Sequence, residues 1–550
     1  MNRRTFLASA LASTAAPGFL LAESPIELPT DHRALMRARK KRIVVQQDVF
    51  WVMLNYAKLH PDKTPPFGPF RDVAFSYVDQ PGSQIDAVWW DIAGNAPGSA
   101  YPSMVAPVTP PPLVERWHRD GIDWIAELTN ETRRRKLEVF WTHRISEVDL
   151  RPEGGHAPDP DPRKLEHPDW VLPATWWKHG MWNLASPGLR QHKVALLREI
   201  ATRYDLDGIQ IDFARHIPCL PVGRQWEFRG KVTEFLRMTR SMLLEVGRER
   251  KRPFLLAARV PQNLGGCHVD GFDVETWARE NLVDILTLGS RTMDVDVEGM
   301  RAAVGGGVQL QPCFDDHHAT DGYRYAPLEL LRGVFANHLQ RGADSVVTFN
   351  WGVAAPELAE SIGGEITPQT HQEAFKEVGD LRTLAGKDKV FAVERRGGYP
   401  WADGYFNRND DAPLPAPLTL DGGAVAFTLH VSDAPSAKSS LILRGIFFGM
   451  EDQDELAASA NGQRLAVALR DMEWKDPQIF SPAPQPPSGG KGKYKVNPKQ
   501  RLLRVEWSVP HGVWKQGPNR IEISLAKHAQ AEGGTTKLLI EKLEGYLRYE

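Results

Sequence analysis

Eight short runs of β-branched, aromatic and other apolar residues are the feature that most constrains this fold. Most are almost continuously apolar, which is typical of parallel strands buried on both faces. Helical patterns separate many of them, including one that begins at Ser186-Pro187 and one over about 227–249. Eight strand–helix repeats predict an α/β fold, a TIM (β/α)8 barrel over 40–395. The runs are Arg42–Asp48, Ile85–Asp91, Leu137–His143, Gly208–Asp212, Phe254–Val260, Val283–Leu288, Val308–Phe314 and Ser345–Asn350.

The last third of the chain has a different pattern. A closing helix over 373–384 is followed by a segment rich in Gly, Pro, Asn and Asp, which predicts a linker over 396–416. Strand patterns without intervening helices then predict an antiparallel β-sandwich over 417–550. These strands are 424–431, 440–448, 502–508, 520–525 and 537–549. The sandwich either binds carbohydrate, for which Trp474, Trp507 and Trp514 are available, or braces the barrel.

Composition excludes several functional classes. The chain has 67 Lys and Arg against 69 Asp and Glu, a net charge of −2, so we expect no nucleic-acid partner. Trp (17) outnumbers Tyr (11), and indole faces suit stacking on sugar rings as well as core packing. Three cysteines, Cys219, Cys267 and Cys313, are too few for a disulfide framework.

The N-terminus has the pattern of an export signal. Adjacent arginines in Asn-Arg-Arg-Thr-Phe-Leu precede a modest apolar run that ends near Ala22. We therefore expect a twin-arginine signal peptide over 1–22 and a periplasmic or secreted protein. No later run is long enough to span a bilayer, so we expect no membrane insertion after signal removal.

The residues that end the predicted strands should share one face of the barrel, where TIM-barrel active sites lie. Carboxylates, arginines and indoles dominate these positions. The sharpest is Asp212, which ends Asp207-Gly-Ile-Gln-Ile-Asp212 and is followed by Arg215. A carboxylate there can attack or stabilise an anomeric carbon, and Arg215 could keep it ionised by charge pairing.

Two segments resemble a known family. Tyr204-Asp-Leu-Asp-Gly-Ile-Gln-Ile-Asp-Phe-Ala-Arg215 resembles the Tyr-x-Val-Asp-Gly-Ile-x-Phe-Asp-Tyr-x-Arg segment of the glycosyl hydrolase-like 10 family. Leu137-Glu-Val-Phe-Trp-Thr-His-Arg144 resembles the preceding barrel strand of that family. The resemblance implies a TIM barrel, carbohydrate hydrolysis and Asp212 as the active-site carboxylate. The sequence departs after Arg215, where His-Ile-Pro-Cys219 replaces Tyr-Pro, so the sugar stays unidentified.

Glycoside hydrolysis usually needs a second carboxyl group as proton donor. We favour Asp315, because it follows strand seven, across the mouth from strand four. The alternatives are Asp316, Glu147, Asp48 and Asp91, each after a predicted strand, and, more weakly, Glu275.

Other side chains at the strand ends are candidates for substrate binding. Arg144 and Arg259 could bind a sugar carboxylate or sulfate, or could pair with carboxylates of the site itself. The remaining candidates are Trp89, Asp91, His143, Arg215, Asp316, His317, Asn350 and Trp351.

Two rival functions remain. The first is a catalytically inert glycan-binding barrel, and the second is a metal-dependent hydrolase that uses the three cysteines and nearby histidines. Because the sequence has no Cys-x-x-Cys pair and no His-Glu-x-x-His helix, we expect no metal and no organic cofactor. The resulting prediction is an exported glycoside hydrolase with a carbohydrate substrate.

Overall fold

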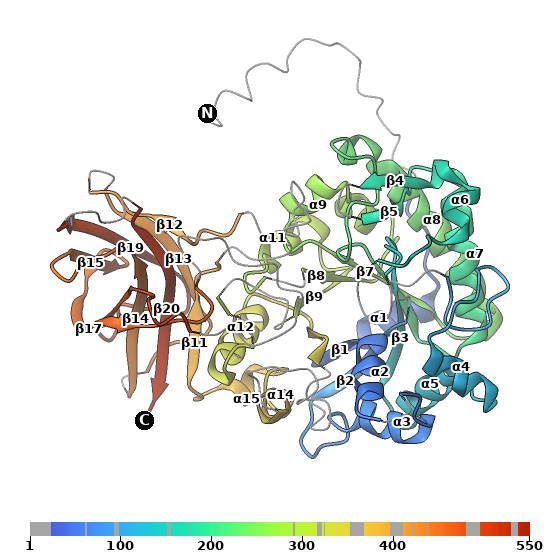
Figure 1. The fold of residues 1–550 in the computed structure, drawn as a ribbon, viewed down its shortest axis with the longest axis horizontal. Coiled ribbons are helices and arrows are strands. Elements are labelled where there is room, and N and C mark those ends of the chain that lie inside the picture. The colour runs from blue at the N-terminus through green and yellow to red at the C-terminus, as the bar shows by residue number, and fades with distance from the viewer. Residues whose placement is uncertain are drawn as a thin grey trace, which may run out of the picture.

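A computed structural model gives the fold of the chain (Figure 1). The predicted signal peptide and residues 396–410 of the predicted linker lie outside the described residues. The structure describes residues 24–60, 63–92, 98–150, 156–174, 177–289, 292–315, 322–323, 325–351, 368–395, 411–420, 423–436, 438–479, 496–529 and 537–550.

Eight parallel strands close into a barrel in the order β1-β10-β9-β8-β7-β6-β3-β2. The predicted TIM barrel is confirmed, and each strand begins and ends within two residues of the predicted run. The strands are β1 (Ile43–Asp48), β2 (Ile85–Asp91), β3 (Glu138–Arg144), β6 (Gly208–Asp212), β7 (Leu255–Val260), β8 (Ile285–Leu288), β9 (Gln309–Phe314) and β10 (Val346–Phe349).

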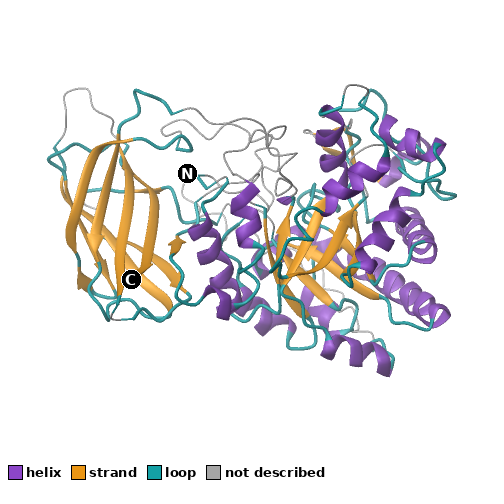
Figure 2. Cartoon of the chain, turned by 90° about the horizontal axis from the view of Figure 1, so that it is seen from below, coloured by secondary structure: helices purple, strands orange, loops and turns teal. Residues whose placement is uncertain are grey.

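Helices surround the barrel, as Figure 2 shows from below. None of those in the described part of the chain is long and apolar enough to cross a membrane. They are α1 (Thr30–Ala38), α2 (Val49–Lys58), α3 (Phe67–Phe75), α4 (Pro112–Arg119), α5 (Trp124–Arg134), α7 (Pro187–Arg203), α8 (Gln225–Arg250), α9 (Leu264–Asp270), α10 (Val274–Arg279), α11 (Val297–Val304) and α12 (Leu328–Gln340).

The predicted closing helix over 373–384 is wrong, because two short helices, α14 (Pro368–Ala374) and α15 (Leu381–Leu384), take its place. The break is at Gly379. Its N–H donates to the Gln84 side chain (2.8 Å), and a Cβ there would lie 2.8 Å from Ile43 Cγ1. The chain turns there because the close approach to β1 admits no side chain.

A long insertion follows β3. It contains α6 (Pro162–Glu166), a short 3-10 helix (Pro168–Trp170) and an antiparallel hairpin of β4 (Val171–Ala174) and β5 (Trp177–Trp182). Lys164 of α6 is buried within this insertion and donates to Asp149 Oδ2 (2.7 Å) and to the carbonyl of Gly180 (3.1 Å). Lys164 thus connects α6 to the residues just after β3 and to the hairpin.

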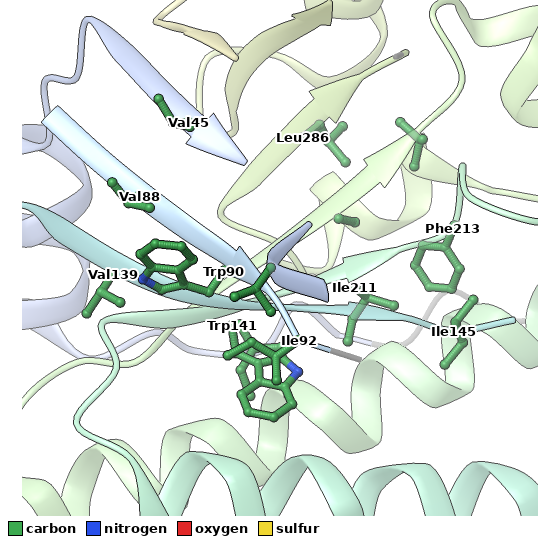
Figure 3. Packing of buried hydrophobic residues seen from close by; sticks show 14 of the residues in the cluster. Val45, Val88, Trp90, Ile92, Val139, Trp141, Ile145, Ile211, Phe213 and Leu286 are labelled. Atoms are coloured by element: carbon green, nitrogen blue, oxygen red, sulfur yellow. The ribbon is translucent and has the colours of Figure 1, made fainter. Parts of the chain in front are cut away.

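The strands are buried on both faces. Their outward side chains, among them Trp90, Trp141 and Ile211 in Figure 3, belong to one hydrophobic cluster that also contains buried residues of the surrounding helices. Inside the barrel, a polar belt of five side chains crosses the core. Thr142 donates to Gln210 (3.1 Å), Gln210 and Gln311 both donate to the hydroxyl of Thr287 (2.9 Å each), and Ser345 donates to Gln311 (3.0 Å). The five side chains of the belt are therefore paired with one another.

The predicted antiparallel sandwich is also confirmed. One sheet has the order β11-β20-β14-β18-β17, with β12 paired to β20, and the other has the order β13-β19-β15-β16. Trp507 and Trp514 are buried in the sandwich core, so neither is a surface for sugar binding. The strands are β11 (Lys389–Ala392), β12 (Ala416–Pro417), β13 (Val425–Val431), β14 (Ser439–Phe448), β15 (Glu455–Ala460), β16 (Gln463–Arg464), β17 (Ala466–Trp474), β18 (Leu502–Ser508), β19 (Gly517–Lys527) and β20 (Leu539–Tyr549).

The barrel and the sandwich meet along α12 and β11 (Figure 1). Strand β11 lies within the predicted barrel segment, 40–395, and pairs with β20 of the sandwich. Gly333 of α12 lies so close to β11 that a Cβ there would be 1.9 Å from the carbonyl oxygen of Val390.

Candidate active site

Five charged side chains meet inside the barrel at the carboxyl ends of the strands. We call Asp48, Asp91, Arg144, Asp212 and Arg259 the charged layer. They end β1, β2, β3 and β6 or, for Arg259, come one residue before the end of β7. The register sets Asp48 beside Asp91, and Asp212 between Arg144 and Arg259. The parallel barrel thus gathers acids and bases at the face where TIM-barrel active sites lie.

Asp212 is fully buried and bound on both oxygens. Oδ1 accepts hydrogen bonds from Arg259 Nε (2.9 Å) and from the N–H groups of Ala214 and Arg215 (3.0 Å each). Oδ2 accepts from Arg259 Nη2 (2.5 Å). The guanidinium of Arg259 in turn lies 4.3 Å from the centre of the Phe349 ring. A bidentate cation and two amide donors together stabilise the carboxylate and fix its orientation.

Arg144 bridges two other carboxylates. Its Nη2 lies 2.7 Å from Asp48 Oδ2 and 2.8 Å from Asp91 Oδ2. Burial raises the pKa of Asp48, but Arg144 outweighs burial, so that pKa is lower than usual. Burial raises the pKa of Asp91 to about 7 in spite of Arg144, and Asp91 Oδ1 has no hydrogen-bond partner among the described residues. The two carboxyl groups held by one arginine therefore differ in proton affinity.

Sequence comparison identifies the family that this part of the barrel resembles. Residues 78–219 match the model of the glycosyl hydrolase-like 10 family. The predicted resemblance is confirmed, and the matched segment contains Asp91, Arg144 and Asp212 of the charged layer. A comparison with curated proteins finds no match.

Several solved glycosidase structures are similar in fold at low identity. α-L-Fucosidase isoenzyme 2 from Paenibacillus thiaminolyticus is 13% identical, with a TM-score of 0.39, over 64% of this chain and 51% of that protein. An α-amylase from Anoxybacillus is 10% identical, with a TM-score of 0.37, over 89% and 99%. The glycoside hydrolase domain of PgaB (BpsB) from Bordetella bronchiseptica is 12% identical, with a TM-score of 0.39, over 62% and 99%. This chain spans about half the length of the fucosidase.

The partner of Asp212 in this family-matched site differs from the predicted one. Arg215 was expected to pair with Asp212, but Arg259 makes the bidentate pair and Arg215 contributes its backbone N–H. Register explains the difference, because Asp212 and Arg259 are opposite each other on neighbouring strands. Of the two possibilities for Arg144 and Arg259, the structure has both paired with carboxylates of the site itself.

Two predicted substrate contacts lie elsewhere. His143 points out of the barrel, since its neighbours Thr142 and Arg144 both point inward, and its Nε2 is 3.7 Å from Glu147 Oε1. Burial lowers the pKa of His143 to about 3, so the ring is neutral. Trp89 does point inward, but it is buried below the charged layer, where it stacks on Phe140 at 4.3 Å.

The residues after β10 serve the protein's own packing. Trp351 is fully buried and stacks on His371, with 4.2 Å between ring centres. Asn350 adopts a left-handed φ of 60°, and its Oδ1 accepts a hydrogen bond from the N–H of Asp48 (3.0 Å). Trp351 is thus no sugar platform, and Asn350 is buried where it fixes the end of β1.

The candidates for the second carboxyl group differ in their burial and in their hydrogen-bond partners. Glu147 Oε2 accepts from Trp182 Nε1 (2.7 Å) and Lys193 Nζ (2.9 Å). Burial alone raises the pKa of Glu147, but Lys193 and nearby charges lower it to about 2, so Glu147 is a poor proton donor. Asp315 is fully buried directly after β9, whereas Asp316 and His317 lie outside the described residues.

A metal-dependent hydrolase would need several ligand side chains close together. Within the described ranges, no three His, Cys, Asp or Glu side chains come together to hold an ion. Cys219, Cys267 and Cys313 are buried and not disulfide-bonded, and burial raises the pKa of the Cys313 thiol to about 12. A thiol of that kind is protonated at neutral pH.

Sequence reasoning missed Trp182 and Lys193, which hold Glu147, and it did not say which carboxylate Arg259 binds. The partner of Arg259 could have been found, because Asp212 ends one predicted strand and Arg259 comes one residue before the end of the next. The contacts of Trp182 and Lys193 with Glu147 could not have been found, because no sequence pattern predicts how the insertion after β3 folds back onto Glu147.

Proposed function

We propose that this protein is a glycoside hydrolase in which Asp212 acts as nucleophile or base. The observation that carries the proposal is the charged layer at the carboxyl ends of the strands, within the segment that matches the glycosyl hydrolase-like 10 family. Arg259 and two backbone N–H groups orient the carboxylate and stabilise its charge. Oxocarbenium-like transition states at a sugar carbon are stabilised by a fixed negative charge of this kind.

Asp91 fits the proton donor better than Asp315, the residue that the sequence favoured. A donor must hold its proton near neutral pH, and burial gives Asp91 a pKa of about 7. Its Oδ1 is also free of other hydrogen bonds in the described structure. Both properties support Asp91 as the group that protonates the oxygen of the leaving group while Asp212 stays charged.

The carboxylate partners of Arg144 and Arg259 bear on the charge of the sugar. Arg144 and Arg259 both have carboxylate partners within the layer, so neither is available to select an acidic sugar. We propose a neutral or polar glycan as substrate. We also propose that the protein is exported through its twin-arginine segment, which detection of the mature N-terminus near residue 23 in the periplasm would test.

A second candidate is an inert glycan-binding barrel. It is favoured by the complete burial of Asp212 and by the four hydrogen bonds that the protein itself supplies to that carboxylate. In an inert barrel Asp212 would be the partner of a structural ion pair and nothing more.

One experiment separates the two candidates. Wild type, Asp212→Asn and Asp86→Asn are assayed for reducing ends released from neutral, uronic and sulfated polysaccharides. An enzyme loses about a thousandfold in kcat/KM on Asp212→Asn and is unchanged by Asp86→Asn, since Asp86 pairs with Arg42 at the exposed start of β2. Glycan binding without release of reducing ends by any of the three proteins would establish the inert barrel.

The proton donor is tested by the pH profile. With Asp91 as donor, kcat/KM falls as the pH rises through about 7, because the donor loses its proton. Asp91→Asn removes that alkaline limb together with most of the activity, and Asp315→Asn leaves the limb in place. If the alkaline limb of the pH profile persists in Asp91→Asn and disappears in Asp315→Asn, Asp315 is the proton donor.

A further inference from the structure

Glu394 connects the sandwich to a loop at the mouth of the barrel. It comes two residues after the end of β11, and the backbone around it belongs to the sandwich. The N–H of Val393 donates to the carbonyl of Leu543 (2.9 Å), and the carbonyl of Glu394 accepts from the N–H of Leu414 (3.2 Å). Glu394 is 4% exposed, and its side chain extends into the barrel domain, where it meets residues 292–294, between β8 and α11.

The contact is made by one carboxyl oxygen. Glu394 Oε2 accepts hydrogen bonds from the N–H groups of Met293 (2.6 Å) and Asp294 (3.0 Å), and the Thr292 hydroxyl lies 3.2 Å away. Oε1 is buried without a hydrogen-bond partner in the described part of the molecule. Two consecutive backbone N–H groups aimed at one oxygen define the path of the chain after β8.

Other contacts place this segment beside the charged layer. The N–H of Asp296 donates to the carbonyl of Gln262 (3.0 Å), three residues beyond Arg259, and the N–H of Gly289 donates to the carbonyl of Val260 (2.8 Å). Gly289 and Asp296 are thus tied to the end of β7 and the residues just after it, and β7 is the strand that supplies the cation of the Asp212 pair.

Gly322 and Tyr323, between β9 and α12, lie against β20, the sandwich strand that pairs with β11. Gly322 has a φ of 89°, and a Cβ there would lie 2.8 Å from Lys542 Cε. The Nζ of Lys542, a residue of β20, lies 4.6 Å from the centre of the Tyr323 ring, and Tyr323 is buried. Two consecutive loops on the carboxyl side of the barrel therefore contact the sandwich.

We propose that the C-terminal sandwich positions the mouth of the barrel, and that Glu394 is the positioning residue that fixes residues 292–296 beside Arg259 and Asp212. The proposal rests on the proposed function for its effect on activity. The positioning itself is a property of the fold and is measured without substrate.

The environment of Glu394 gives the contact a pH dependence. Burial raises the pKa of Glu394 to about 8, although the Met293 and Asp294 amides oppose the shift. The charged and titratable groups around it are Asp294, His338 and Arg341 of the barrel and the adjacent Arg395. His338 Nε2 lies 3.0 Å from the carbonyl of Met293, and Arg341 pairs with Asp294 (2.8 Å).

The sign of the effect follows from the direction of the shift. The closed contact favours the protonated carboxyl group, whereas an open, solvated Glu394 returns to its ordinary pKa. Closure is therefore strongest at pH 5, weakens as the pH rises toward 8, and is constant above that value.

Hydrogen exchange of the full-length chain tests the proposal. We expect Glu394→Ala to speed exchange of the Met293 and Asp294 amides about tenfold or more, and Glu394→Gln to restore protection because the amide oxygen still accepts both bonds. The matched control is Glu329→Gln, which alters a contact between α12 and β20 (3.9 Å to Arg548) away from residues 292–296. It should leave exchange there unchanged.

The pH dependence of amide exchange distinguishes a positioning role of Glu394 from a general contribution to stability. Protection of these two amides, corrected for intrinsic exchange, should fall by roughly a few hundredfold between pH 5 and pH 8 in wild type and stay level in Glu394→Gln. Equal exchange of wild type and Glu394→Ala would overturn the proposal. If exchange behaves as expected and no variant, wild type included, cleaves a glycan, the positioning stands and the proposed function fails.

With an active substrate, Glu394→Ala should lower kcat more than it raises KM, and Glu394→Gln should recover most of the loss. A matched loss of activity in Glu329→Gln would show that any disturbance of the interface suffices, which would remove Glu394 from its assigned role.

Discussion

The charges of the layer explain the unusual carboxyl group within it. Asp48, Asp91 and Asp212 are three acids, and Arg144 and Arg259 are two permanent cations, all of them in the barrel interior. With every acid ionised the five residues would carry a net negative charge away from water. Protonation of Asp91, the acid with a pKa of about 7, makes the group neutral. Burial is the main reason why Asp91 keeps its proton, and the excess of acid over base in the layer adds to it through Asp48 and Asp212.

The pair between Arg259 and Asp212 is expected to be costly to break. Arg259→Met removes the cation and leaves Asp212 buried and charged, so we expect a loss of about 3–5 kcal/mol in the free energy of unfolding. Urea denaturation at pH 7 measures the loss. Arg42→Met is the control, because the pair between Arg42 and Asp86 is partly exposed, and should cost less than about 1 kcal/mol. A loss from Arg259→Met no larger than that of the control would contradict a structural role for the pair.

Single residues show how far sequence reasoning reached. Asp212 and Arg144 are at the strand ends where the pattern put them. His143 is adjacent to Arg144, and neighbours on a strand face opposite sides, so the two could not share the mouth. That error was avoidable. The position of Trp351 could not be foreseen, because Trp351 lies beyond its strand and its ring partner, His371, is 20 residues further along the chain.

Strands were the elements that the sequence predicted best. All eight barrel strands were found because burial on both faces leaves long apolar runs. The missed strands of the sandwich lack that signal. In β17 every residue is exposed or half-buried, and β11 has four residues and obtains its partner, β20, from the far end of the chain. The polar belt was missed for a related reason, since each of its residues looks like an isolated interruption until the barrel closes.

The strand that carries Asp212 begins at a position where only glycine fits. A Cβ on Gly208 would lie 2.4 Å from Phe140 Cζ and 2.7 Å from the carbonyl oxygen of Leu255. We expect Gly208→Ala to cost about 2–3 kcal/mol by overpacking and to shift β6 against β3. Chemical denaturation measures the cost, and Gly306→Ala, with open space around its Cβ, is the control. Equal stability of the two variants would mean that β6 has room to move.

At the scale of the whole molecule, the barrel and the sandwich are joined by hydrogen-bonded strands as well as by side-chain packing. Strand β11 leaves the barrel, pairs with β20 and packs on α12. Asn337 of α12 also donates to the carbonyl of His430 in β13 (3.0 Å), so α12 contacts an edge strand of each sheet. A helix that touches both sheets resists rotation of one domain against the other.

This interface predicts that the two domains unfold together. Gly333 lets α12 approach β11, and a Cβ there would lie 1.9 Å from the carbonyl oxygen of Val390, a backbone atom that cannot move alone. We expect Gly333→Ala to separate the helix from the strand, lower the Tm by about 3–5 °C and split a single calorimetric transition into two. Gly68→Ala is the matched helical control, since its Cβ would meet nothing within 4 Å, and it should raise the Tm slightly or leave it unchanged. Two transitions already present in wild type would mean that the domains are independent, and the mouth loops would then need another support than the sandwich.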